Sequence, residues 1–211
     1  MNKKSFLTAS TLALAISTAT TAVYSAELEE IIVTAQKRAE SLQDVPISMS
    51  ALSGSTIKDN GIHSFQDLSG YVPNLEIAEN AVNTIITMRG IGIGSNQSFE
   101  QSVGIYVDGV HFGKSRQVRS GLFDVEQVEV LRGPQGILFG KNTLAGAINV
   151  TTASANVGDE FSGGIDVSQE SYNGQIVDAH IAGSVTDNLA LRFAISCLLY
   201  TSPSPRDSGK S

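Results

Sequence analysis

The 211-residue sequence contains no tryptophan and only one cysteine, Cys197. Residues 1–196 therefore offer no disulfide, thiolate metal ligand or cysteine nucleophile. Basic residues are also scarce, because 14 Lys and Arg stand against 21 Asp and Glu for a formal net charge of -7. No basic run follows the first four residues, which excludes nucleic acid as an expected partner. The three histidines are too far apart in the chain to indicate a metal site: His63, His111 and His180.

Catalytic and nucleotide-binding motifs are missing as well. The run 136–142 approaches a phosphate-binding loop, but it has three residues instead of four between its glycines and Asn142 where Ser or Thr is needed. The run 90–94 lacks the third glycine of a dinucleotide fingerprint. Glu126 and Glu129 are expected to be strand-face or loop carboxylates. We therefore expect no catalytic residue, no metal, no cofactor and no enzyme activity.

The first 26 residues are predicted to be an export signal. A short basic start at Lys3 and Lys4 precedes an apolar stretch over 6–22, and acidic sequence begins at Glu27, which is the order of a cleaved secretory signal. A buried N-terminal helix is the alternative. No other apolar run reaches the roughly 20 residues that a membrane helix needs. An exported chain of this kind is periplasmic, secreted or an outer-membrane β-barrel.

Residues 27–40 are predicted to be an extended tether. The β-branched run 31–34 favours an extended chain, and it follows the export signal closely. A tethered extended segment is suited to adding as a strand to the sheet edge of a partner. The same run is equally compatible with an ordinary first strand of the domain, and spacing alone leaves both interpretations open.

Residues 41–152 are predicted to form an α+β domain, a small mixed sheet with short helices. A helix is expected over 55–60, closed by Gly61, and a capping box over 64–67 is expected to open another. Asp108-Gly109 is a turn signal between two strands. Strands are expected over 45–52, 85–88, 105–110, 125–131 and 147–152.

The pattern changes to strict alternation at Phe161. Apolar side chains take every second position over 161–167, 177–185 and 189–195. Runs of about ten residues with this period are typical of transmembrane β-strands, although a soluble β-meander alternates in the same way. Residues 153–196 are predicted to be the first antiparallel strands of a transmembrane β-barrel.

These segments together resemble the TonB-dependent outer-membrane receptors. The run 29–35, Glu-Glu-Ile-Ile-Val-Thr-Ala, resembles their TonB box. Six further runs resemble their plug domain in order: Val45-Pro46-Ile47, Met88-Arg89-Gly90, Tyr106-Val107-Asp108-Gly109, Val128-Glu129-Val130-Leu131-Arg132-Gly133-Pro134, Gly140-Lys141-Asn142-Thr143 and Gly146-Ala147-Ile148-Asn149. The resemblance implies a plug that folds inside a barrel and blocks its lumen.

The resemblance also implies partners and site residues. The periplasmic protein TonB, which is driven by the proton gradient through an inner-membrane complex, would pair with Glu30, Ile31, Ile32, Val33, Thr34 and Ala35. Arg89 and Arg132 each precede a glycine at a strand-to-loop transition, and arginine can make bidentate ion pairs with carboxylates. In the family such arginines hold the plug to the barrel wall. The alternative is a pair of solvated surface arginines.

The expected function is energised uptake of a large, scarce nutrient across the outer membrane of a Gram-negative bacterium. A ferric siderophore is favoured as cargo, and cobalamin, haem, other metal chelates and glycans stay open. Outer-membrane lipid would surround the strands. The alternatives are a periplasmic ligand-binding or enzymatic soluble domain, a passive porin, and a transporter that also signals.

Three strands cannot enclose a lumen, since plugged transporters of this kind have about 22. We therefore expect a truncated fragment that is inactive by itself. Alternation stops after residue 196, and residues 197–211 are predicted to be a non-native tail without function.

Overall fold

The computed structural model describes residues 31–34, 38–80, 83–94, 100–119, 121–169 and 174–199. All of them belong to one compact unit. The predicted export signal, Glu30, Ala35 and residues 200–211 of the predicted tail lie outside the described residues.

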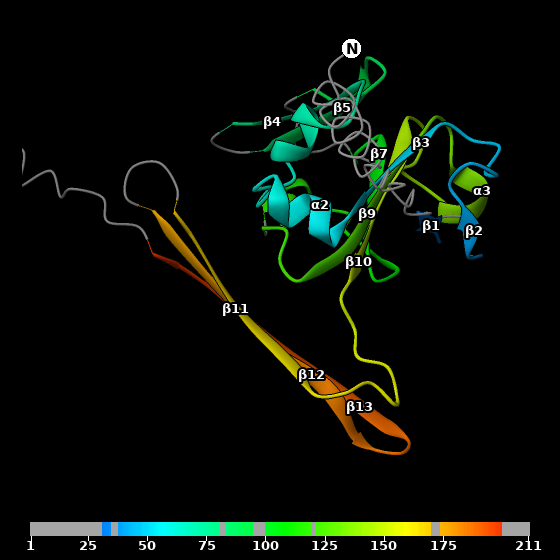
Figure 1. Ribbon diagram of the computed structural model, residues 1–211. Helices are drawn as coiled ribbons and strands as arrows, with labels where there is room; N and C mark the ends of the chain where they lie inside the picture. Colours follow the sequence, from blue (N-terminus) through cyan, green and yellow to red (C-terminus); the bar gives the residue numbers. More distant parts are fainter. Residues whose placement is uncertain are drawn as a thin grey trace, which may run out of the picture. The chain divides into compact units, whose positions relative to one another are not determined.

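A five-stranded mixed sheet forms the centre of the plug region (Figure 1). β10 pairs antiparallel with β9 and parallel with β7. The inner strands are rich in β-branched and aliphatic residues, which suit a pleated surface buried on both faces. In spatial order the strands are β3 (Met49–Ser53), β9 (Val125–Arg132), β10 (Gly146–Thr152), β7 (Val103–Val107) and β8 (Val110–His111).

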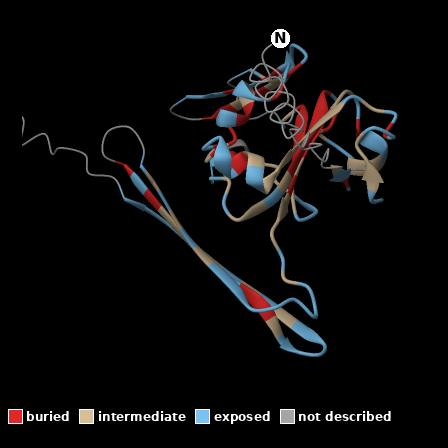
Figure 2. Ribbon diagram, viewed as in Figure 1, coloured by how far each residue is buried: buried red, intermediate tan, exposed pale blue. Residues whose placement is uncertain are grey.

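The main hydrophobic core covers one face of this sheet, where Val128, Val130 and Ile148 pack. Burial of these side chains provides the main driving force for the fold. Figure 2 shows the buried residues concentrated along the central strands. The elements that contribute to this core are α2 (Gly54–Asp59), the 3₁₀ helices η1 (Asp67–Gly70) and η2 (Ser115–Arg119), and the antiparallel strands β4 (Leu75–Glu79) and β5 (Thr84–Met88), next to β6 (Ile91–Gly92).

The opposite face of the sheet carries a smaller cluster. Tyr106, Leu131 and Ala147 are buried there, and Phe139 of the short helix α3 (Gly136–Phe139) packs against them. Figure 1 shows α2 and α3 on opposite sides of the sheet. The two faces arise because successive side chains of a strand point in opposite directions.

Local signals in the sequence account for the chain reversals. Ser53 caps α2 by accepting a hydrogen bond from the Thr56 amide at 3.3 Å. Ser64 and Asp67 bond reciprocally as a capping box does, since the Asp67 amide donates to Ser64 Oγ at 3.3 Å and the Ser64 amide donates to Asp67 Oδ2 at 2.8 Å. The helix that follows is a single 3₁₀ turn.

The Asp108-Gly109 turn joins β7 and β8 as predicted. Both residues have positive φ, 48° and 78°, which is the conformation of the two-residue hairpin turns that match strand twist. Val107 pairs with Val110 across it.

Two segments differ from the sequence prediction. The strand predicted over 45–52 begins only at Met49, and Pro46, which lies within the missing stretch 45–48, has no N–H to give to a ladder. β4 was not predicted, although its alternation is clear, with Leu75 and Ile77 buried. Its other face carries the exposed residues Glu76 and Ala78, as expected for the solvent-facing side of such a strand.

A separate three-stranded antiparallel sheet follows the plug region. It consists of β11 (Ser162–Gln169), β12 (Gln175–Thr186) and β13 (Leu189–Leu199). The predicted alternation is confirmed, because Ile165 pairs with Ala179 and Ala179 with Ile195, so that their side chains share one face. That face is open, with Ile165 75% exposed.

β13 continues three residues past the predicted end of the alternating region. Cys197 pairs with Val177, and Leu199 pairs with Gln175. Backbone pairing does not require alternation, so apolar residues in succession extend the ladder. No helix in the described part of the chain combines the length and the apolar character that crossing a membrane would require.

Candidate functional site

The segment predicted to bind a partner is extended. Ile32 and Val33 form β1, which pairs antiparallel with β2 (Glu40–Ser41). Their side chains alternate, since Val33 is 1% exposed whereas Ile32 is 46% exposed. One side chain thus anchors the segment on the plug and the next faces outward.

β2 bonds one edge of this segment. The Leu42 amide donates to the Ile31 carbonyl at 3.0 Å, and Val33 is the next residue whose backbone faces β2, opposite Glu40. In an extended chain, the backbone groups of successive residues point to opposite edges. Ile32 therefore presents its backbone to the other edge.

Two side chains of β9 occupy that other edge. Gln127 Nε2 donates to the Ile32 carbonyl at 3.0 Å, and the Thr34 amide donates to Glu129 Oε1. The Thr34 hydroxyl lies 3.5 Å from the same carboxylate oxygen. The segment 31–34 is thus held along both edges.

Glu129 is fully buried, with 0% of its surface exposed. Asn149 Nδ2 donates to its second oxygen, Oε2, at 2.8 Å. A buried carboxylate is costly unless its oxygens accept hydrogen bonds, and here the tether supplies one of the donors through Thr34. The sequence placed Glu129 on a strand face but gave no signal for its partner, which lies 95 residues away.

A cavity of about 460 Å³ lies beside this contact. Tyr106 forms part of its wall and donates from its hydroxyl to the Phe139 carbonyl. Burial raises the pKa of Tyr106, so that it stays a neutral donor. The other lining residues include Thr34, Asp108, Leu138, Asn149 and Thr151.

The structure brings the two predicted arginines, Arg89 and Arg132, close to each other. Arg89 lies in a turn with φ of 52°, and its Nη1 would be 3.7 Å from a Cβ placed on Gly133. Burial, and then the charge of Arg89, lowers the pKa of Arg132. Two neighbouring cations repel each other unless an anion lies between them.

Arg132 bonds mainly to neutral groups of the plug. Its Nε donates to the Pro73 carbonyl at 3.2 Å and its Nη1 to Ser48 Oγ at 3.1 Å, and Nη2 donates to Ser50 Oγ. Among the residues that the structure describes, neither Arg132 nor Arg89 forms an ion pair with a carboxylate. The predicted carboxylate partners of these arginines are thus not found within the described ranges.

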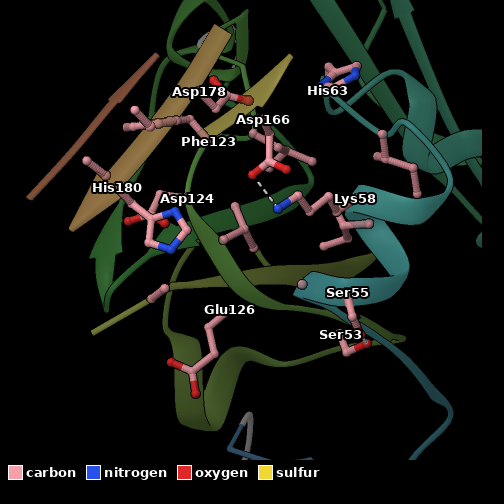
Figure 3. A pocket seen from close by; sticks show the side chains of 18 of the residues that line it. Ser53, Ser55, Lys58, His63, Phe123, Asp124, Glu126, Asp166, Asp178 and His180 are labelled. Carbon is pink, nitrogen blue, oxygen red and sulfur yellow. Dashed lines mark hydrogen bonds and ion pairs between the residues drawn. The ribbon is translucent and has the colours of Figure 1, made fainter. Parts of the chain in front are cut away.

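Other charged residues link the plug region to the three-stranded sheet. Arg192 of β13 donates to both oxygens of Asp124, at 2.8 Å from Nε and 2.5 Å from Nη2. Lys58 of α2 forms an ion pair with Asp166 of β11, which Figure 3 shows. These contacts border a cavity of about 440 Å³. None of these four residues was predicted to form an ion pair. Asp166 and Arg192 could be recognised only as charges on the polar face of alternating strands.

The described residues hold no cluster of three His, Cys, Asp or Glu side chains that could bind a metal. What the geometry offers is backbone recognition at β1, a cationic pair in the plug, and ion pairs between the plug and the following strands.

Comparison with known proteins identifies the family to which this chain belongs. The TonB-dependent receptor plug domain family matches residues 41–147, which is 107 of the 211 residues. The chain belongs to this family.

Its relatives are receptors and transporters. The pesticin receptor of Yersinia pestis is 32% identical over 167 residues, covering 74% of this chain and 24% of the relative. The iron-regulated outer membrane virulence protein of Vibrio cholerae is 27% identical over 183 residues, covering 78% of this chain and 26% of the relative. The chain thus spans about a quarter of the length of the curated relatives it matches.

Solved structures of outer-membrane receptors show the same fold. The crystal structure of the ferric yersiniabactin uptake receptor FyuA from Yersinia pestis superposes with a TM-score of 0.63 at 31% identity, covering 72% of this chain and 24% of that one. The alcaligin outer-membrane receptor FauA from Bordetella pertussis has the same fold, with a TM-score of 0.63 at 20% identity over 79% of this chain and 29% of that one. The predicted fold class is confirmed: a mixed-sheet plug domain with few helices is followed by antiparallel strands that resemble the start of the receptors' barrel.

Proposed function

We propose that this chain is the plug-bearing part of an outer-membrane receptor that takes up a ferric siderophore by using energy delivered through TonB. The observation that carries the proposal is the extended segment at Ile32-Val33, docked on a plug domain of the TonB-dependent family. Several relatives are siderophore or iron-regulated outer-membrane receptors by name. The receptor is proposed to act in the outer membrane of a Gram-negative bacterium.

In this proposal the box comprises Glu30, Ile31, Ile32, Val33, Thr34 and Ala35. Four of these residues, 31–34, are described, and Ile32 and Val33 among them already form a strand. A partner strand that adds to an extended segment gains backbone hydrogen bonds without reordering it. TonB would then pull on the tether of residues 27–40 and rearrange the plug, proposed as residues 41–152, inside a barrel that begins with 153–196.

Siderophore uptake is favoured over the other classes of function. A passive porin has no use for a docked box, and a soluble ligand-binding or enzymatic domain has no use for an open apolar face such as that of β11–β13. The relatives in the comparison are receptors and transporters, and we propose that this chain likewise has no enzyme activity. Cobalamin is the cargo named for one relative, which makes it the second candidate.

Proline at position 32 tests the box. Ile32→Pro removes a backbone donor from the segment, and we expect binding of the purified periplasmic domain of TonB, measured by calorimetry, to fall by at least about tenfold, equivalent to about 1.4 kcal/mol. Ile32→Ala is the control, because it keeps the donor and loses only a half-exposed side chain. Equal binding by the wild type and the proline variant would contradict the proposal that residues 30–35 bind TonB.

We also propose that Arg89 and Arg132 jointly hold a carboxylate of the barrel. Their proximity supports this role, since one carboxylate can bridge two guanidinium groups. In an intact receptor, Arg132→Glu should increase protease cleavage of the plug and open-pore conductance, whereas Arg38→Glu, an exposed charge reversal outside the plug sheet, should not. A plug that stays equally protected in the Arg132 variant would contradict the proposal.

A further inference from the structure

The proposed box segment has a backbone edge that is occupied by side chains and not by a strand. On this edge lie the Ile32 carbonyl and the Thr34 amide, which are two residues apart and point the same way. Gln127 donates to the first and Glu129 accepts from the second. One donor and one acceptor thus stand where the backbone of an adjoining strand would stand.

The two side chains can do this because they project from the same face of β9. Residues two apart in a strand share a face and are separated by about 7 Å, which is also the spacing of Ile32 and Thr34 along β1. Asn149 on the neighbouring strand β10 donates to the other oxygen of Glu129 at 2.8 Å and fixes the carboxylate.

We infer that Gln127 and Glu129 form a side-chain cap that imitates an adjoining strand and must leave the Ile32–Thr34 edge before a partner strand adds there. The identity of the partner rests on the proposed function, whereas the cap stands on the contacts alone. The opposite edge is bonded by β2. A partner strand therefore competes either with two side-chain contacts or with an existing strand, and the capped edge is the one at which no strand has to be displaced.

The cap is suited to reversible holding. A hydrogen bond to a charged acceptor is stronger than a neutral one, so Glu129 is its main contact and Gln127 its weaker one. A partner strand replaces both with backbone bonds. A cavity lined by Thr34 and Asn149, the two residues that donate to Glu129, adjoins the cap.

Amide exchange in the full 211-residue chain tests the cap directly. Glu129→Gln removes the charge but keeps the shape, and we expect the Thr34 amide to exchange about tenfold faster, because a bond to a charged group is replaced by a weaker neutral one. The amides of Val130 and Ile148 in the central sheet should keep their exchange rates. Glu126→Gln is the matched control, because it makes the same change at an exposed position of the same strand, and it should leave Thr34 unaffected.

Gln127→Ala provides a second variant outside the hydrophobic core. It removes only the contact to the Ile32 carbonyl, and a rise of about threefold in Thr34 exchange is expected for the loss of one neutral bond. If Glu129→Gln also accelerates exchange of the core amides, the Thr34 exchange rate in Gln127→Ala decides whether the cap exists. Unchanged Thr34 exchange in both variants, or an equal rise in the Glu126 control, overturns the cap.

Binding of the TonB periplasmic domain to the same variants tests the competition. Faster Thr34 exchange together with about tenfold tighter binding in Glu129→Gln supports the inference. Faster exchange with unchanged binding overturns the claim that cap and partner compete. If no variant and no wild-type chain binds TonB, the proposed function fails, and Thr34 exchange alone then decides whether the cap exists.

Discussion

The central sheet of the plug and the sheet of β11–β13 differ both in their pattern of apolar residues and in what covers their faces. Val130 and Ile148 in the central sheet are buried under the main core, and the second face of that sheet is covered by α3. In the second sheet, Ile165 and Phe193 on the apolar face are 75% and 67% exposed. A sheet with one uncovered apolar face needs an apolar environment, which a lipid bilayer provides.

The largest expected effect on this contrast is the loss of stability caused by a cavity in the plug core. Ile148→Ala should lower the free energy of unfolding by about 2–5 kcal/mol, because it removes a fully buried side chain from a packed site. Chemical denaturation of the chain in detergent measures it. Phe193→Ala on the open face is the comparison variant, and an equal loss from it under the same conditions would contradict the contrast between the two sheets.

A charge on the open face should reveal the environment of the second sheet. Ile165→Arg is expected to cost about 2–4 kcal/mol in a bilayer if the position lies near the midplane, and very little in water, where the side chain is already exposed. The measurement is the fraction of an intact receptor that folds into lipid vesicles. Asp166→Asn on the opposite face provides the comparison, and efficient folding of the Ile165 variant would argue that this face does not meet lipid.

The two ion pairs between the regions should differ in strength. Asp124→Asn breaks a bidentate pair in which both side chains are less than one-fifth exposed, and a loss of about 1–3 kcal/mol is expected. Lys58→Ala removes a more exposed pair with Asp166, which should matter by less than about 1 kcal/mol. Denaturation midpoints of both variants test which ion pair stabilises the chain more. A larger loss of stability from Lys58→Ala than from Asp124→Asn would contradict this expectation.

The sequence predicted those parts of the fold whose signals are local. β9, β10 and the β7–β8 turn were found because β-branched runs and the Asp-Gly pair act over a few residues. β4 was missed although Leu75 and Ile77 alternate with exposed residues.

Contacts between distant segments could not be predicted in the same way. Glu129 and Thr34 are 95 residues apart, and neither residue type indicates that a carboxylate will accept from a tether amide. Arg89 and Arg132 were each placed at the end of a strand, but the sequence did not show that both bond to the Pro73-Asn74 segment, whose carbonyls accept from Arg132 Nε and from the Arg89 amide. The bounds of the signal, tether, plug, strand region and tail stay predictions.

The central claim is that TonB binds the segment 31–34 and acts on the plug through it. Energised uptake by an intact receptor tests this claim most directly. Cells carrying Ile32→Pro should bind a radiolabelled ferric siderophore normally and accumulate none of it inside, while Ile32→Ala cells should accumulate it. Accumulation at the wild-type rate in the proline variant would contradict the account.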